Sequence, residues 1–156
     1  MALFCDIILL KRGKNMRISI GSDHGGFNLK EQVVKYLETK YDVVDYGCQN
    51  LDSCDYPVYA KKVASDVSNK QSDFGILICT TGIGMSITAN KFKNVRAALV
   101  TNIESAHLTR MHNNSNVICL GAKFTTYDEA ISYIEAFLNE KFEGGRHERR
   151  VNQIEE

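Results

Sequence analysis

Short apolar runs alternate with longer amphipathic segments along most of the chain. Each run is too short for a globular helix, so we expect buried strands at residues 17–21, 43–46, 74–79, 96–100 and 116–120. The intervening segments carry apolar residues at helical spacing, as at Ala60, Val63, Ala64 and Val67. Strands that alternate with helices predict an α/β fold, a three-layer, Rossmann-like, doubly wound sheet of five mainly parallel strands.

Capping and turn residues indicate where the helices begin and end. Pro57 fits the first turn of the helix after the second strand, and the helix before that strand is expected to run to about Lys40. Either Thr101 or Asn102 would cap the helix that extends to about Met111. The last amphipathic helix carries its apolar stripe on Ala130, Ile131, Ile134, Phe137 and Leu138.

The segment from Asp73 to Ser86 is predicted to be a strand, a tight turn and the start of a helix over residues 86–92. Cys79 is the last residue of the strand. The first amides of a helix have no partner within it, so an anion can bind to the loop of Thr80, Thr81, Gly82, Ile83 and Gly84. A thiol that faces a helix N-terminus ionises more readily and is a candidate base or nucleophile. The alternative is a buried cysteine that only packs.

Two further loops follow strands of the predicted sheet. Asp23 and His24 follow the first strand, ahead of two glycines, and Lys123 follows the fifth strand. Doubly wound sheets bind ligands at the carboxyl ends of their strands, so these side chains and Cys79 could meet at one rim. The alternative for His24 is a histidine in a surface turn.

A second candidate set lies nearer the C-terminus. His112 and Asn113 end the fourth expected helix, where a histidine also complements the negative helix end and Asn113 or Asn114 can supply a left-handed cap. Arg146 and Arg150 would share one face of a helical turn, and guanidinium groups bind phosphate well. The alternative for these arginines is a solvated tail. His107 is interpreted as a packing or surface residue.

Composition and charge exclude several classes of binding partner and site. The 156 residues suffice for one globular domain, and a formal net charge of zero creates no field that would recruit nucleic acid or a membrane. Five cysteines without a CxxC pair or a secretory signal indicate reduced thiols and a cytoplasmic location. The four histidines form no HExxH motif, so the sequence predicts no metal site.

The first 15 residues are expected to be an extension. The apolar residues 7–10 and the basic residues after them fit neither a signal peptide nor a membrane span, which needs about 20 apolar residues. We therefore divide the chain into an N-terminal extension (1–15), a Rossmann-like domain (16–142) and a C-terminal arm (143–156). Apolar Val151 and Ile154 could dock the arm on a neighbouring subunit.

Five motifs stand in one order along the chain: SDHGGFNLK, DYP at residues 55–57, GILICTTGIGMSITANKF, HNNSNV and EGGRHERRV. In this order they resemble the ribose-5-phosphate isomerase B family, within a larger group of sugar-phosphate isomerases that includes the galactose-6-phosphate isomerase subunits. The resemblance covers about residues 16–151. Five ordered motifs are far more specific than any single one.

The resemblance implies an aldose–ketose isomerase of the pentose phosphate pathway that interconverts D-ribose 5-phosphate and D-ribulose 5-phosphate through an enediolate. Neither a metal nor an organic cofactor is implied. By this resemblance Cys79 is the base, His112 is the acid that opens the sugar ring, and the amides of residues 80–84 stabilise the enediolate. The remaining substrate ligands would be Asp23, His24, Tyr56, Asn113, Lys123, Arg146 and Arg150.

The family also implies a homodimer or homotetramer in which His112 and Asn113 reach Cys79 of another subunit. Lys123 stands where many members have arginine, which keeps the charge but loses the bidentate fork. Some branches use a glutamate base, whereas this chain has Met85 and Ser86 in that region.

Other functions on the same fold are a dinucleotide site and a noncatalytic phosphosugar sensor. Ile87 occupies the third glycine position of the dinucleotide fingerprint, which argues against the first. A sensor would not need Cys79 together with His112. Among isomerases, the alternative substrates are six-carbon phosphates such as allose 6-phosphate and galactose 6-phosphate.

Overall fold

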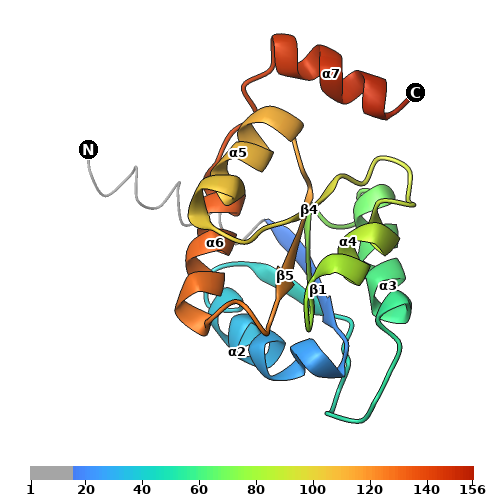
Figure 1. Ribbon diagram of the computed structural model, residues 1–156, viewed down its shortest axis with the longest axis vertical. Coiled ribbons are helices and arrows are strands. Elements are labelled where there is room, and N and C mark those ends of the chain that lie inside the picture. Colours follow the sequence, from blue (N-terminus) through green and yellow to red (C-terminus); the bar gives the residue numbers. More distant parts are fainter. Residues whose placement is uncertain (1–15) are drawn as a thin grey trace.

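A single five-stranded sheet forms the centre of the computed structural model, which describes residues 16–156. The expected extension at residues 1–15 lies outside the described residues. All neighbouring strands are parallel, in the order β2-β1-β3-β5-β4 (Figure 1). The strands are β1 (Arg17–Ser22), β2 (Asp42–Asp45), β3 (Phe74–Cys79), β4 (Ala97–Leu99) and β5 (Val117–Gly121). This confirms the doubly wound α/β fold.

Helices cover both faces of the sheet (Figure 1). One face packs against α2 (Phe27–Leu37), α5 (Ile103–Asn113) and α6 (Tyr127–Asn139), and the other against α3 (Tyr56–Ser68) and α4 (Ile83–Ala89). A short 3-10 helix η1 (His24–Gly26) precedes α2, and α7 (Arg146–Ile154) packs on α5. Within residues 16–156, no helix combines the length and apolar character that crossing a bilayer requires.

Alternation along the strands decides which face each side chain occupies. Ile76 and Ile78 of β3 join the cluster under α2 and α6, whereas Leu77 and Cys79 join the cluster under α3 and α4. The sheet order reverses between β1 and β3, so the loops after these two strands flank the topological switch point. Cys79 therefore ends a strand at the place where such sheets bind ligands.

Several element ends differ from the sequence prediction. α4 begins at Ile83 rather than Ser86, because Gly82 alone reverses the chain with φ of 77° and Gly84 is already helical. It ends at Ala89, since the side chain of Asn90 pairs with both backbone groups of Ala97 on β4.

At each end of the fourth helix, the structure shows which of the two predicted candidates is the capping residue. Asn102 rather than Thr101 caps α5, because its Oδ1 accepts the N–H of Ser105 at 2.8 Å. At the other end Asn114, with φ of 46°, supplies the left-handed cap. The helix ends at Asn113, two residues beyond the expected end. α2 ends at Leu37, three residues before Lys40.

A fully buried lysine joins α2 to the edge strand β2. Lys30 Nζ lies 2.7 Å from Asp45 Oδ2 and 2.7 Å from Glu31 Oε1, and the side chain is 0% exposed. Burial alone would lower the pKa of Lys30, but its hydrogen bonds with the two carboxylates raise that pKa overall. The lysine is therefore charged at neutral pH and depends on its partners.

We expect Asp45→Asn to lower the free energy of unfolding by about 1–3 kcal/mol, because the buried ammonium loses its charged partner on β2. Glu31→Gln is the matched control: that carboxylate is 44% exposed, so its loss should cost well under about 1 kcal/mol. Urea unfolding of the two variants measures the difference. If both variants were destabilised equally, the ion pair between Lys30 and Asp45 would contribute no more to stability than the one with Glu31.

Candidate active site

Cys79 lies at the carboxyl end of β3 with its side chain almost closed off, at 5% exposure. Its Sγ accepts the N–H of Gly82 at 3.0 Å. A side chain at residue 82 would clash, because a Cβ there would lie 2.6 Å from Leu99 Cδ1 and 2.9 Å from the carbonyl carbon of Leu120. The glycine therefore brings an amide donor onto the sulfur, and such a donor stabilises a thiolate.

A second thiol nearby has a different environment. Cys119 on β5 lies in the same apolar cluster as Cys79 and is fully buried, and burial strongly raises its pKa. Cys119 is therefore a neutral packing residue. Of these two cysteines, Cys79 is the one with a backbone amide directed at its sulfur.

The loop after β1 presents His24 in a fixed orientation. The N–H of Cys54 donates to His24 Nδ1 at 3.2 Å, so the hydrogen of the neutral ring is on Nε2. Asp23 is buried, and its Oδ1 accepts the N–H of Gly26 at 3.1 Å, which caps η1. A Cβ on Gly25 would collide with Thr80 Oγ1, so this loop is in direct contact with the loop that follows Cys79.

The loop after β5 is bonded to the same segment. The N–H of Ala122 donates to the carbonyl of Cys79 at 2.9 Å, and that of Lys123 to the carbonyl of Thr80 at 3.0 Å. The side chain of Lys123 is exposed. On the other side, a Cβ at Gly84 would lie 2.6 Å from the ring of Tyr56, so this ring closes over the start of α4. The structure thus gathers the three loops, Tyr56 and Cys79 at the switch point.

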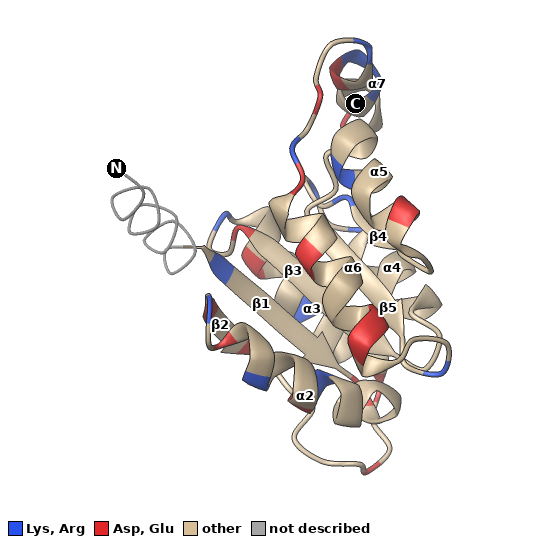
Figure 2. Cartoon of the chain, turned by 90° about the vertical axis from the view of Figure 1, so that its left-hand side faces the viewer, with Lys and Arg blue, Asp and Glu red and all other residues tan. Residues whose placement is uncertain are grey.

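The other predicted site residues lie elsewhere within one chain. α5 runs back across the sheet, so His112 and Asn113 at its end lie near the amino ends of the strands. There Arg96, just before β4, donates from Nε to the carbonyl of Asn114 at 3.0 Å. Figures 1 and 2 both show α7 at the far end of the molecule from α2, the helix that follows η1. The structure therefore does not bring His112, Asn113, Arg146 or Arg150 to Cys79 of the same chain.

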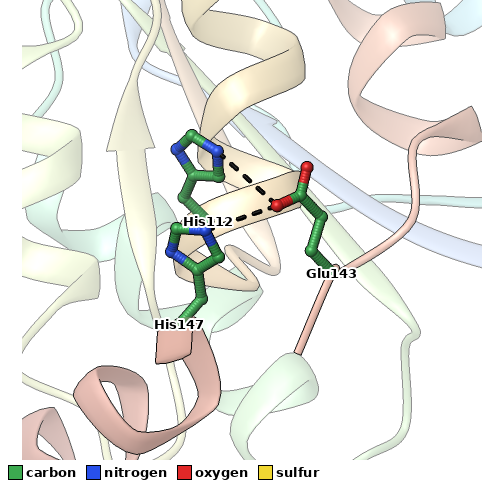
Figure 3. A group of neighbouring side chains, drawn as sticks. All are labelled: His112, Glu143 and His147. Atoms are coloured by element: carbon green, nitrogen blue, oxygen red, sulfur yellow. Dashed lines mark ion pairs between the residues drawn. The ribbon is translucent and has the colours of Figure 1, made fainter. Parts of the chain in front are cut away.

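His112 instead belongs to a cluster with Glu143 and His147 (Figure 3). The two imidazole rings stack with centroids 4.2 Å apart and an interplanar angle of 11°. Burial lowers the pKa of His147, and the nearby His112 and Arg146 lower it further. Sequence reasoning missed Glu143 and His147 as partners of His112, although both lie within the EGGRHERR segment. His107 pairs with Glu140, through Nδ1 and Oε2 at 2.9 Å.

The doubly wound sheet and its switch-point loops define an α/β protein with a ligand site at the carboxyl ends of β1 and β3. The family model for Ribose/Galactose Isomerase matches residues 18–154, and the chain belongs to this family. This confirms the resemblance seen in the five motifs.

Individual relatives match over nearly their whole length. Ribose-5-phosphate isomerase B of Escherichia coli is 42% identical over 139 residues, which cover 88% of this chain and 93% of that protein. A ribose 5-phosphate isomerase structure from Thermotoga maritima aligns with a TM-score of 0.88 and 45% identity, covering 90% of this chain and 97% of the other. Ribose-5-phosphate isomerase B of Mycoplasma genitalium, solved with bound ribulose-5-phosphate, aligns with a TM-score of 0.87 and 46% identity, covering 91% and 95%.

Proposed function

We propose that this chain interconverts D-ribose 5-phosphate and D-ribulose 5-phosphate, with Cys79 as the base. Membership of the Ribose/Galactose Isomerase family and the ribulose-5-phosphate bound by the Mycoplasma genitalium relative support this substrate. The observation that carries the role of Cys79 is its sulfur at the switch point, with the Gly82 amide 3.0 Å away. That amide favours the thiolate, which is the form that accepts a proton.

In the proposed reaction, the Cys79 thiolate removes the C2 proton of the open-chain aldose and returns it to C1. The hydroxyl proton moves from O2 to O1, so the sugar is isomerised without an external oxidant or reductant. Negative charge develops on the enediolate oxygens, where backbone amides stabilise it. Gly82 N–H already donates to sulfur and Ile83 N–H to Thr81 Oγ1, so of the loop amides we propose those of Thr80, Thr81 and Gly84 for this task.

The ring-opening acid and the phosphate ligands are proposed to come from a second subunit. The end of α5, with His112 and Asn113, and α7, with Arg146 and Arg150, lie away from the carboxyl end of β3 in the same chain, so a homodimer would complete two equivalent sites. The arm at residues 143–156 would then supply phosphate-binding guanidinium groups to the partner. A homotetramer built from two such dimers would contain the same sites.

An apolar surface near β4 supports the homodimer. This three-residue strand lies at the sheet edge, and exposed apolar side chains surround it on α4, β4 and the start of α5. They are Ile83, Ile87, Leu99 and Ile103.

The described cysteines are unpaired, which supports a reducing, cytoplasmic compartment.

The test is a comparison of kcat/KM for five-carbon and six-carbon sugar phosphates. We expect ribose 5-phosphate to exceed allose 6-phosphate and galactose 6-phosphate by at least about 10-fold, because one extra carbon changes the distance between the reacting carbons and the phosphate. A preference for either six-carbon sugar would contradict the proposed substrate. Phosphosugar binding without turnover of any of the three would favour the sensor.

A further inference from the structure

Three metal-binding side chains converge where α5 meets the C-terminal arm (Figure 3). His147 Nε2 lies 3.3 Å and His112 Nε2 lies 3.9 Å from the same oxygen, Glu143 Oε2. One ligand atom of each residue lies within 4.8 Å of the other two. The backbone fixes this arrangement, since Glu143 N–H donates to the carbonyl of Met111 at 3.0 Å and so ties the arm to the last turn of α5.

Two imidazoles and one carboxylate are a donor set for zinc and similar transition metals. With metal–ligand bonds of about 2.0–2.2 Å, donors around a tetrahedral ion lie about 3.3–3.5 Å apart. The separations, at most 4.8 Å, therefore need to close by up to about 1.5 Å, and the two stacked rings need to rotate so that both imidazoles face one ion. Glu143 and His112 are free to make this adjustment because their side chains are 44% and 37% exposed.

We propose that His112, Glu143 and His147 bind a divalent transition ion of the Zn²⁺ class, with a remaining coordination position that this chain does not fill. His112 is distant in sequence from Glu143 and His147, so the three form no recognisable motif, and the sequence therefore predicted no metal site. Arg146 and Arg150 lie close enough to act on His147 electrostatically, and their positive charge opposes the bound cation. The carboxylate of Glu143 offsets part of this repulsion.

A second histidine–glutamate pair at the same junction provides an internal control. His107 Nδ1 lies 2.9 Å from Glu140 Oε2, again between α5 and the segment that follows α6. No second histidine joins this pair in the clusters formed by residues 16–156. An ion held by single carboxylate–imidazole pairs would bind to both places, whereas the proposed site requires His147.

The experiment is a titration of the metal-free, full-length Cys79→Ser protein with Co²⁺ and then Zn²⁺, followed by visible absorption and calorimetry. The serine background removes the active-site thiol as a competing ligand. We expect one ion per chain, displaced by Zn²⁺, with affinity lowered at least about 10-fold by Glu143→Gln or His147→Gln and unchanged by His107→Gln. Circular dichroism establishes that each variant is folded; Glu143 is exposed, so its variant should fold.

Absence of stoichiometric binding would overturn the proposal and leave a cluster that only shares protons. Unchanged affinity in both the Glu143 and His147 variants would overturn it equally. A further consequence rests on the proposed function: an ion on His112 Nε2 blocks ring opening, so Zn²⁺ should inhibit the native enzyme more strongly than its Glu143→Gln variant. Stoichiometric binding without this difference would support the metal site and count against the catalytic role of His112.

Discussion

Cys79→Ala is expected to lower kcat for ribose 5-phosphate by about 10²–10⁴-fold or more, because general-base catalysis by a positioned side chain contributes that much. The KM should change little, since the groups proposed to hold the phosphate, Arg146 and Arg150, are untouched. The variant should also remain folded, because a small residue replaces a small one at the end of β3. Steady-state kinetics and a binding titration with ribulose 5-phosphate measure the two effects separately.

Cys119→Ala is the matched control for that experiment. It removes a thiol from the same apolar cluster, at a site that is fully buried and whose pKa is raised by burial. This substitution should lower the free energy of unfolding by about 1 kcal/mol and leave turnover within a few-fold of the native enzyme. If Cys79→Ala kept native turnover, the sulfur would have no part in proton transfer. If both variants lost turnover equally, the loss would reflect packing.

The central strands β1, β3 and β5 could be predicted from sequence because they are buried on both faces and therefore appear as compact apolar runs, whereas the edge strands β2 and β4 are only partly buried. The glycine turn after Cys79 was also predictable, since only glycine tolerates φ of 77° with a backbone carbon 2.9 Å from its Cβ position. The start of α4 was misplaced because Gly84 resembles a turn residue. Packing of Tyr56 on Gly84 accounts for a glycine inside the helix, and that contact joins residues far apart in sequence.

The site was predictable only in part, for reasons that differ between residues. Asp23, His24 and Lys123 follow strands, so the fold alone brings their loops to Cys79. The N–H of Cys54 that orients His24 belongs to a long loop without a sequence signal for this contact. Glu143 and His147 meet His112 because the backbone of the arm bonds to Met111, an irregular tertiary contact that local propensity does not encode.

A heterodimer that pairs a Cys79→Ala subunit with a His112→Ala subunit is expected to recover about half of the native specific activity, although each homodimer is nearly inactive. If one site combines Cys79 of one chain with His112 of the other, the heterodimer has one intact site and one site with both lesions. Co-expression with two different affinity tags yields the heterodimer in pure form, and its turnover of ribose 5-phosphate is measured against both homodimers.

The control pairs a Cys79→Ala subunit with a subunit that carries both substitutions, which leaves no intact site in either arrangement. An inactive Cys79→Ala/His112→Ala heterodimer would mean that the two residues serve the same site within one chain. That result would require the end of α5, and α7 with it, to move from the amino ends of the strands to Cys79, against the hydrogen bond of Arg96 with Asn114. Recovery of activity would instead leave the single-chain fold unchanged and explain why His112 and Cys79 lie near opposite ends of the strands in one chain.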